Sequence, residues 1–383
     1  MKALVFGGSF DPPHRGHMRM LAAALRHLRP ERTYIVPAYR SPLKPGARAP
    51  AADRLRMTRL ALEESIPAGR RRGVAVEDFE VRRGRTTYTY QTLRHLRLRH
   101  PGAEFHFLAG GDALEDFEAW KRPAELRAAC GFLIGRRSGA RAHPRGRGLP
   151  RLGILPGSFP DISSTEVRCR LLAGEDVASA VGRLVLGHIR RRKLYGLDLQ
   201  ARLSRELGRE RYHHTVCVAR SAIDLALRHG LDAERAAYAA LLHDCGRIVP
   251  MSRMLAYAKA RGLRVPHRDA AARRDPSLLH AAVSADLARR RYGAADSGVL
   301  SAIRKHTLGD KDMSPLDRLL YTADACSADR DFPEAGRIRR AARRDLDEGY
   351  REAVRMKLEY VLKSGQWLHP TGVTVWNRIV DGT

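Results

Sequence analysis

The sequence predicts an α/β domain built on a parallel sheet, followed by an all-α domain. Through about residue 190, short apolar runs alternate with helical patterns, which is the order of a parallel βαβ layout. From about Asp198 onward, long helical patterns follow one another and strand-like runs almost disappear. The chain has 383 residues, more than the size at which one hydrophobic core usually stops growing. We place the boundary at Tyr195-Gly196, which gives domains of residues 1–195 and 196–383.

Six apolar runs are the expected strands: residues 2–6, 33–37, 74–79, 105–109, 132–134 and 152–155. The first ends at Gly7-Gly8, a tight turn, and a helical pattern follows over residues 17–28. Further helical patterns cover residues 51–65 and 89–99, and the Gly, Arg and Pro-rich residues 136–150 are expected to form a surface loop. Ligands of such sheets bind at the carboxyl ends of the strands.

Composition excludes several classes of protein. With 44% apolar residues, each half can bury a core, but no run approaches the roughly 20 apolar residues of a membrane span. The start MKALVFGGSF lacks the features of a signal peptide, and the five cysteines form no CxxC pair, so we expect a cytoplasmic protein.

The net charge of +28 comes from 70 basic and 42 acidic residues. The arginines are spread over both halves in short runs without interleaved aromatic residues, so we do not expect nucleic-acid binding. The charge would attract polyphosphate substrates in a general way. The sequence leaves open whether the chain forms a homo-oligomer.

The turn after the first expected strand reads GGSFDPPHRGH, residues 7–17. Glycines there let backbone N–H groups approach a phosphate closely, and a helix beginning near His17 would point its positive end at the same anion. His14 and His17 are three residues apart, so both can face one phosphate chain and donate hydrogen bonds where charge develops.

This stretch resembles the HxGH signature of the nucleotidylyltransferase superfamily and, with its neighbours, is similar to bacterial nicotinate-mononucleotide adenylyltransferases. The other matching motifs follow in order: Lys44 in SPLKP, Arg54 in DRLRM, TYTYQTL, GGDALEDFEAW and ISSTEVR. They cover essentially all of residues 1–195. The resemblance implies a Rossmann-like domain that transfers AMP from ATP to nicotinate mononucleotide, with Mg²⁺, giving deamido-NAD and pyrophosphate.

Residue by residue, the resemblance implies an ATP site, an acceptor site and a set of catalytic cations. The ATP-binding residues would be Gly7, Gly8, Ser9, Phe10, His14, His17, Ser163, Ser164, Thr165 and Arg168. The nicotinate-nucleotide site would comprise Lys44, Thr89, Gly111, Asp112 and Trp120, with Trp120 stacking on the pyridine ring. His14, His17, Lys44 and Arg168 would be catalytic. Two positions depart from the family pattern, since Leu43 stands where His is common and Gln91 where Asp is common.

The helical half carries imidazoles and carboxylates on successive helical patterns. They are His214 in RYHHTV, His243-Asp244 in ALLHDCGR, His280 in SLLHA, His306 in IRKHT and Asp324 in YTADA. A lone histidine on an apolar helix face is more often a core residue than a ligand. The set taken together suits a buried dinuclear transition-metal site, in which Asp244 can bridge both ions.

This half resembles HD-domain phosphohydrolases, and closely the symmetrical bis(5′-nucleosyl)-tetraphosphatases, over residues 211–380. The resemblance implies one ion held by His214, His243, Asp244 and Asp324, and a second held by Asp244, His280 and His306, with iron as the metal. Asp244 would be catalytic, and Arg247 and Arg330 would bind phosphate. Diadenosine tetraphosphate would be cleaved at its middle to two ADP.

Other functions of the helical half stay open at this point. It could hydrolyse another nucleotide, such as a guanosine polyphosphate, or act as a non-catalytic nucleotide sensor that regulates the transferase. The charge also leaves an RNA-binding role open, which steeply salt-dependent binding would reveal.

Overall fold

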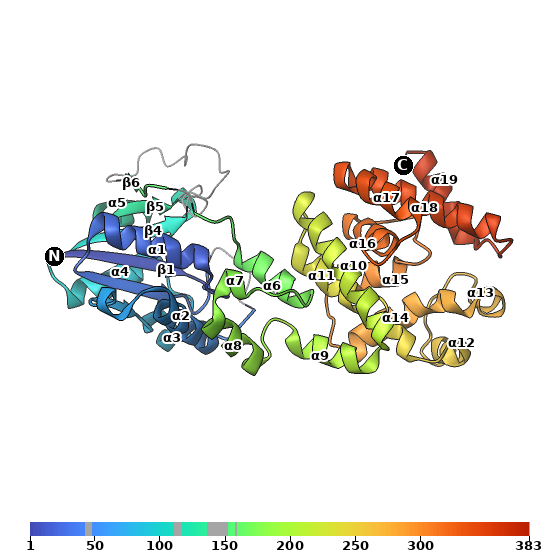
Figure 1. Cartoon of the computed structure of the whole chain (residues 1–383), viewed down its shortest axis with the longest axis horizontal. Helices are drawn as coiled ribbons and strands as arrows, with labels where there is room; N and C mark the ends of the chain where they lie inside the picture. Colours follow the sequence, from blue (N-terminus) through green and yellow to red (C-terminus); the bar gives the residue numbers. More distant parts are fainter. Residues whose placement is uncertain (43–47, 111–116, 136–151, 158, 383) are drawn as a thin grey trace. The chain divides into compact units, whose positions relative to one another are not determined.

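The computed structural model describes residues 1–42, 48–110, 117–135, 152–157 and 159–382, which form two compact units (Figure 1). The first unit comprises Met1–Val167 and Asp176–Tyr195, and the second comprises Arg168–Glu175 and Gly196–Thr383. In the described residues, the strands belong to the first unit and the second unit is helical. The predicted order of an α/β domain and an all-α domain is therefore confirmed.

The first unit is organised by a six-stranded parallel sheet with the order β3-β2-β1-β4-β5-β6. The strands are β1 (Lys2–Gly8), β2 (Arg32–Pro37), β3 (Val74–Val76), β4 (Glu104–Gly110), β5 (Cys130–Gly135) and β6 (Leu152–Ile154). Ala3, Leu4, Val5 and Phe6 are all buried in succession, so the central strand β1 is covered on both faces, as parallel strands normally are. Each of the six predicted strands has formed.

The helices of this unit are α1 (Arg15–Leu28), α2 (Ala51–Ser65), α3 (Phe79–Arg83), α4 (Thr89–Arg99), α5 (Pro123–Ala129), α6 (Ser164–Leu172), α7 (Ala178–Val181) and α8 (Arg183–Arg192). The structure differs from the prediction at β3, which ends at Val76 because Phe79 is already the first residue of α3. The predicted surface loop over residues 136–150 lies outside the described residues.

The second unit contains a chain of helices that begins after Gly196. They are α9 (Leu197–Glu206), α10 (Arg209–Arg228), α11 (Ala233–Leu242), α12 (Met251–Ala260), α13 (Arg268–Arg274), α14 (His280–Arg290), α15 (Ser297–Lys305), α16 (Pro315–Cys326), α17 (Pro333–Arg344), α18 (Leu346–Lys363) and α19 (Pro370–Val380). Small residues such as Ala236, Ala240 and Ala302 fill its main core, which lets the helices approach closely. None of the helices described is long and apolar enough to cross a membrane.

Helix α6 begins in the first unit and ends in the second. Cys169, Leu172 and Ala173 are buried in the main core of the helical unit, together with Leu203. The amide of Gln200 donates to the carbonyl of Leu171, which ties the same segment to α9. Residues 168–175 therefore contribute to the second core, although they precede the predicted boundary.

Candidate functional site

The two histidines of the first motif close the beginning of α1. His14 is the N-cap residue, and its backbone N–H donates to Nδ1 of His17 at 3.2 Å while the N–H of His17 donates to Nδ1 of His14 at 3.4 Å. Because each Nδ1 accepts a hydrogen bond, each neutral ring carries its proton on Nε2. The rings lie with their centroids 3.6 Å apart at the positive end of the helix, where Nε2–H groups can donate to phosphate oxygens.

A side chain at either of two glycines of this segment would be tight. A Cβ on Gly16 would lie 3.0 Å from Nδ1 of His14, and one on Gly8 would lie 3.1 Å from the ring of Phe10. Phe10 itself has a φ of 48°, and its buried ring packs edge-on against Phe6 and His17. The loop conformation that presents both histidines is therefore fixed by packing.

The motif at the start of α6 lies beside this loop. The hydroxyl of Ser164 donates to the carbonyl of Pro12 at 2.9 Å, and the hydroxyl of Ser163 accepts the N–H of Glu166 at 3.0 Å. The structure thus brings the predicted ATP-binding residues Ser163, Ser164 and Thr165 to the loop that carries His14. Gly7, Gly8, Ser9 and Phe10 form the end of β1 and this same loop.

Arg168 lies in a different environment from the one expected for a phosphate ligand. Its guanidinium forms a two-bond ion pair with Glu234 of α11, through Nε at 2.7 Å and Nη2 at 3.0 Å. The side chains are only 11% and 16% exposed. The predicted contact of Arg168 with ATP stays a prediction, and it would require this guanidinium to leave Glu234 or to serve both partners.

The acceptor site is described only in part. Lys44, Gly111 and Asp112 lie outside the described residues. Thr89 is the first residue of α4, and Gln91, the departure from the family pattern, accepts the N–H of Tyr88 through its side chain and so closes the same helix end. Trp120 packs against Phe107 and Phe117, and its indole Nε1 is buried without a hydrogen-bond partner in the described structure.

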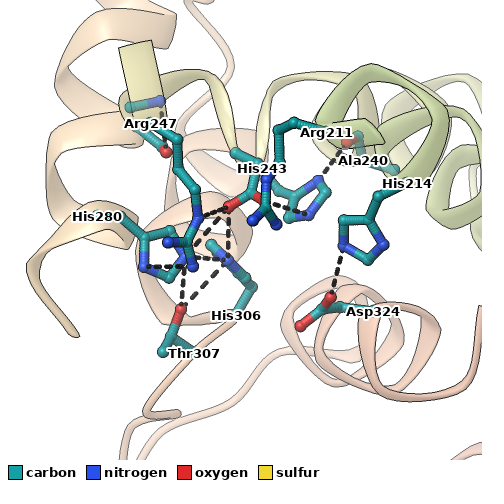
Figure 2. A network of polar contacts seen from close by, with 12 residues as sticks. Arg211, His214, Ala240, His243, Arg247, His280, His306, Thr307 and Asp324 are labelled. Carbon is teal, nitrogen blue, oxygen red and sulfur yellow. Dashed lines mark hydrogen bonds and ion pairs between the residues drawn. The ribbon is translucent and has the colours of Figure 1, made fainter. Parts of the chain in front are cut away.

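The predicted histidines of the second unit converge from α10 and α14 and from the C-terminal ends of α11 and α15 (Figure 2). In three of them, Nδ1 donates to a backbone carbonyl three residues earlier: His243 to Ala240, His280 to Ser277 and His306 to Ile303. In His214, Nδ1 lies 2.7 Å from the carboxylate of Asp329. The carbonyls fix the proton of His243, His280 and His306 on Nδ1 and leave Nε2 as the inward-facing acceptor, which is the tautomer a metal requires.

Asp244 lies between these imidazoles. Its Oδ1 is 3.2 Å from Nε2 of His280 and 4.0 Å from Nε2 of His306, and its Oδ2 is 3.8 Å from Nε2 of His243. Two groups of donors result, His214 with His243 and Asp244, and Asp244 with His280 and His306. Asp324 lies at the first group, with Oδ1 3.2 Å from Nε2 of His214. All six predicted ligands are therefore brought together.

Four cations surround the carboxylates. Arg211 and Arg247 contact Asp244 at 2.8 and 3.1 Å, and Arg330 and Lys357 approach Asp324 at 3.0 and 3.7 Å. The predicted phosphate-binding residues Arg247 and Arg330 are thus both at the site. Burial would raise the pKa of Asp244, but His243, His280 and His306 outweigh it and hold that pKa well below its usual range. Burial lowers the pKa of His243 and His306, so both are neutral at pH 7.

The donor set fits a pair of divalent ions. Nε2 of the buried His243 has no hydrogen-bond partner in the described structure, although its Nδ1 is satisfied. Nε2 of His280 and Nε2 of His306 face each other at 3.0 Å as two acceptors, an arrangement that a cation between or beside them would stabilise. Imidazole and carboxylate donors of this kind suit transition metals.

Sequence reasoning missed four residues of this site: Arg211, Thr307, Asp329 and Lys357. Arg211 lies three residues before His214 on α10, a spacing that could have indicated it. Thr307 follows His306, and its hydroxyl contacts Nε2 of both His280 and His306. Asp329 and Lys357 come from distant segments of the chain, and no local pattern marks them.

Fold and sites together define a nucleotidylyltransferase domain followed by an HD-type, metal-dependent phosphohydrolase domain. Comparison with family models agrees, since the cytidylyltransferase-like family matches residues 5–170 and the HD domain family matches residues 211–329.

Three relatives narrow this class. The symmetrical bis(5′-nucleosyl)-tetraphosphatase of Bacillus subtilis is 32% identical over 184 residues, 47% of this chain and 95% of the relative. The probable nicotinate-nucleotide adenylyltransferase of Aquifex aeolicus is 38% identical over 172 residues, 43% of this chain and 99% of the relative. The probable nicotinate-nucleotide adenylyltransferase/Ap4A hydrolase of Mycoplasma genitalium is 26% identical over 331 residues, 86% of this chain and 88% of the relative.

The chain therefore belongs to the nicotinate-nucleotide adenylyltransferase family and to the family of symmetrical bis(5′-nucleosyl)-tetraphosphatases, and it is an enzyme that joins both. The resemblances read from the sequence are confirmed.

Proposed function

We propose that the first domain transfers AMP from ATP to nicotinate mononucleotide, giving deamido-NAD and pyrophosphate. The observation that carries the proposal is the pair His14 and His17, whose Nε2–H groups lie at the beginning of α1 beside the Ser163–Ser164 turn. In this reaction the phosphate of the acceptor attacks the α-phosphorus in line, and pyrophosphate leaves. The two imidazoles would donate to the oxygens on which charge grows, and Mg²⁺ would neutralise the leaving pyrophosphate.

We further propose that the second domain hydrolyses diadenosine tetraphosphate at its middle, so that one water and one substrate give two ADP. The supporting observation is that Asp244 belongs to both donor groups, as a bridge between two ions requires. Two transition-metal ions, which we take to be iron, would supply Lewis acidity and a water acidic enough to attack phosphorus near neutral pH. Arg247 and Arg330 would bind the phosphates, and the imidazoles would stay fixed by their Nδ1–H bonds.

A product assay of the purified protein on a panel of nucleotides tests both proposals. With ATP, nicotinate mononucleotide should be used in preference to nicotinamide mononucleotide; a tenfold preference for the amide would mean that the acceptor site has been misread. Diadenosine tetraphosphate should give ADP alone, and recovery of ATP plus AMP would show cleavage at another bond. Faster turnover of a guanosine polyphosphate would favour the alternative substrate. A metal-loaded protein without any hydrolysis would favour a nucleotide sensor.

We also propose that the two chemistries are independent and divide between residues 1–195 and 196–383. The described residues of each candidate site come from a single unit. Arg168 is the exception, because it is a predicted ATP-binding residue that belongs to the helical unit. Point variants of the full chain test this better than a cut near residue 195, because residues 168–175 belong to the second core. His17→Ala should spare hydrolysis, and Asp244→Ala should spare adenylyl transfer.

The five free, buried cysteines fit the reducing cytoplasm, where we place the enzyme.

A further inference from the structure

A charged side chain of the family motifs, Arg54 in DRLRM, lies inside the first unit, and the resemblance gives it no role. Among the described residues, Arg54 of α2 is the largest fully buried side chain, with 1% of its surface exposed. A guanidinium in such a place is costly unless its donors are satisfied. Burial lowers the pKa of Arg54, and the neighbouring Asp11 and Tyr195 oppose this effect.

The partners of Arg54 are backbone carbonyls from three segments. Nη1 donates to Ser9 at 2.7 Å and to Ala38 at 2.6 Å, Nη2 donates to Tyr39 at 2.7 Å, and Nε donates to Ala49 at 3.1 Å. Ser9 belongs to the loop after β1, and Ala38 and Tyr39 follow β2. Tyr39 and Ala49 therefore bind the same guanidinium.

The loop after β1 needs such an anchor. Phe10 adopts a positive φ of 48°, which a bulky residue keeps only when its surroundings impose it. On one side, the N–H of Ala38 donates to the carbonyl of Gly8 at 2.9 Å. The carboxylate of Asp11 accepts the N–H groups of Arg48 and Ala49 at 2.7 and 3.1 Å and the hydroxyl of Tyr195 at 2.8 Å.

We propose that Arg54 is a positioning residue for adenylyl transfer, which holds the Ser9 carbonyl and so fixes the loop that presents His14 and His17 to ATP. Asp11 supplies its counter-charge and binds the same Ala49 segment from the other side. The guanidinium spreads its N–H donors over three nitrogens in a fixed plane and so reaches the four carbonyls, whereas the ammonium of lysine has three donors on one nitrogen. The inference rests on the proposed adenylyl transfer. Wild-type protein without transferase activity would refute that function, whereas active wild type with unaffected Arg54 variants would refute only the role of Arg54.

The variants are Arg54→Ala and Arg54→Lys, with Arg59→Ala as the matched control. Arg59 lies on the same helix, but its side chain is 48% exposed and 4.0 Å from Asp78. Each is made with Trp367→Phe and Trp376→Phe, so that Trp120 is the one tryptophan left and reports the folding of the first unit. Steady-state rates are measured with ATP and nicotinate mononucleotide below the temperature at which that fluorescence changes.

A misplaced loop should lower kcat by about 100-fold in Arg54→Ala, since a displacement near 1 Å can cost that much. Arg54→Lys should lose at least about tenfold because it keeps the charge and loses the fork. Arg59→Ala should keep the wild-type kcat, and hydrolysis of diadenosine tetraphosphate should be unchanged in all three. If Arg54 only stabilised the fold, Arg54→Ala would have a lower unfolding temperature but the wild-type kcat per folded chain. That result would overturn the proposal.

Chemical rescue separates positioning from folding. Guanidinium at about 10 mM, far below the molar range in which it denatures proteins, should raise kcat of Arg54→Ala at least about tenfold, and methylammonium should not. Equal rescue by both cations, or by neither, would contradict the role of the fork.

If Arg54→Ala does not fold, Asp11→Asn provides the second test. It retains Arg54 and should lower kcat about tenfold, and an unchanged kcat there would overturn the proposal.

Discussion

Asp329 offers a direct test of how the metal ligands are held. Its Oδ2 lies 2.7 Å from Nδ1 of His214, and its Oδ1 accepts the hydroxyl of Ser327 at 2.6 Å, so the carboxylate is fixed at both oxygens. Asp329→Asn keeps an acceptor of the same shape but loses the charge, and a charge-assisted hydrogen bond is roughly twice as strong as a neutral one. We expect the ion at His214 to bind about tenfold more weakly, which is about 1.4 kcal/mol.

Removal of the acceptor should cost more. Asp329→Ala leaves Nδ1 of His214 without its partner, and we expect a loss of about 100-fold in affinity for the same ion. The assay is metal content per chain after dialysis against chelators of graded strength. The ion at His280 and His306 should be retained, because those imidazoles are held by the carbonyls of Ser277 and Ile303.

Asp331→Asn is the matched control, since Asp331 is exposed and lies two residues further along the same loop. It should retain both ions. Equal loss of both ions in Asp329→Asn, or the same loss in Asp331→Asn, would refute the assignment of Asp329 to His214.

Three further predictions follow from the sites and the core. His17→Ala should lower the rate of deamido-NAD formation by about two powers of ten, as loss of a donor to developing charge does; unchanged turnover would refute its role. Asp244→Ala should remove both ions and hydrolysis together, whereas His306→Ala should remove mainly one ion, which metal analysis measures. Burial raises the pKa of Glu80 to about 7 against an ordinary 4.5, although Thr92 donates to it. The folded state therefore holds this proton more tightly, and the free energy of unfolding should fall by about 3 kcal/mol as pH rises from about 4.5 to 7. Urea unfolding monitored by Trp120 fluorescence in the Trp367→Phe, Trp376→Phe background should show this slope with Glu80 but not with Glu80→Gln; equal slopes would contradict it.

The sheet could be predicted because its central strands are buried on both faces. A run such as Ala3 to Phe6 has no polar residue to accommodate, so it stands out between turn and helix signals. The same reasoning failed beyond Val76, where Phe79 is apolar but begins a helix. A short apolar run satisfies burial in either conformation, so its local pattern does not decide between them.

The clustering of the candidate metal ligands could be predicted because imidazole and carboxylate residues are rare on apolar helix faces. Their supporting residues could not, because support comes from distant segments. Asp329 lies 115 residues from His214 along the chain, and Lys357 approaches Asp324 from α18. Arg168 shows the converse: its motif indicates a phosphate ligand, yet Glu234, 66 residues away, holds its guanidinium in the structure.

The imidazoles of the two sites hold their protons on opposite nitrogens, and this has a consequence for proton release. His14 and His17 have Nε2 protonated and suited to an anion, whereas His243, His280 and His306 have Nδ1 occupied by a carbonyl and a lone pair on Nε2. With the pKa of His243 and of His306 lowered by burial, an arriving divalent ion displaces no proton from either ring. The pKa of His214 is raised by Asp324 and Asp329 against the opposing effect of burial, so an ion that binds this ring competes with a proton. Calorimetric titration of the metal in buffers of different ionisation enthalpy should therefore show proton release by the ion at His214, and that ion should bind more tightly as pH rises.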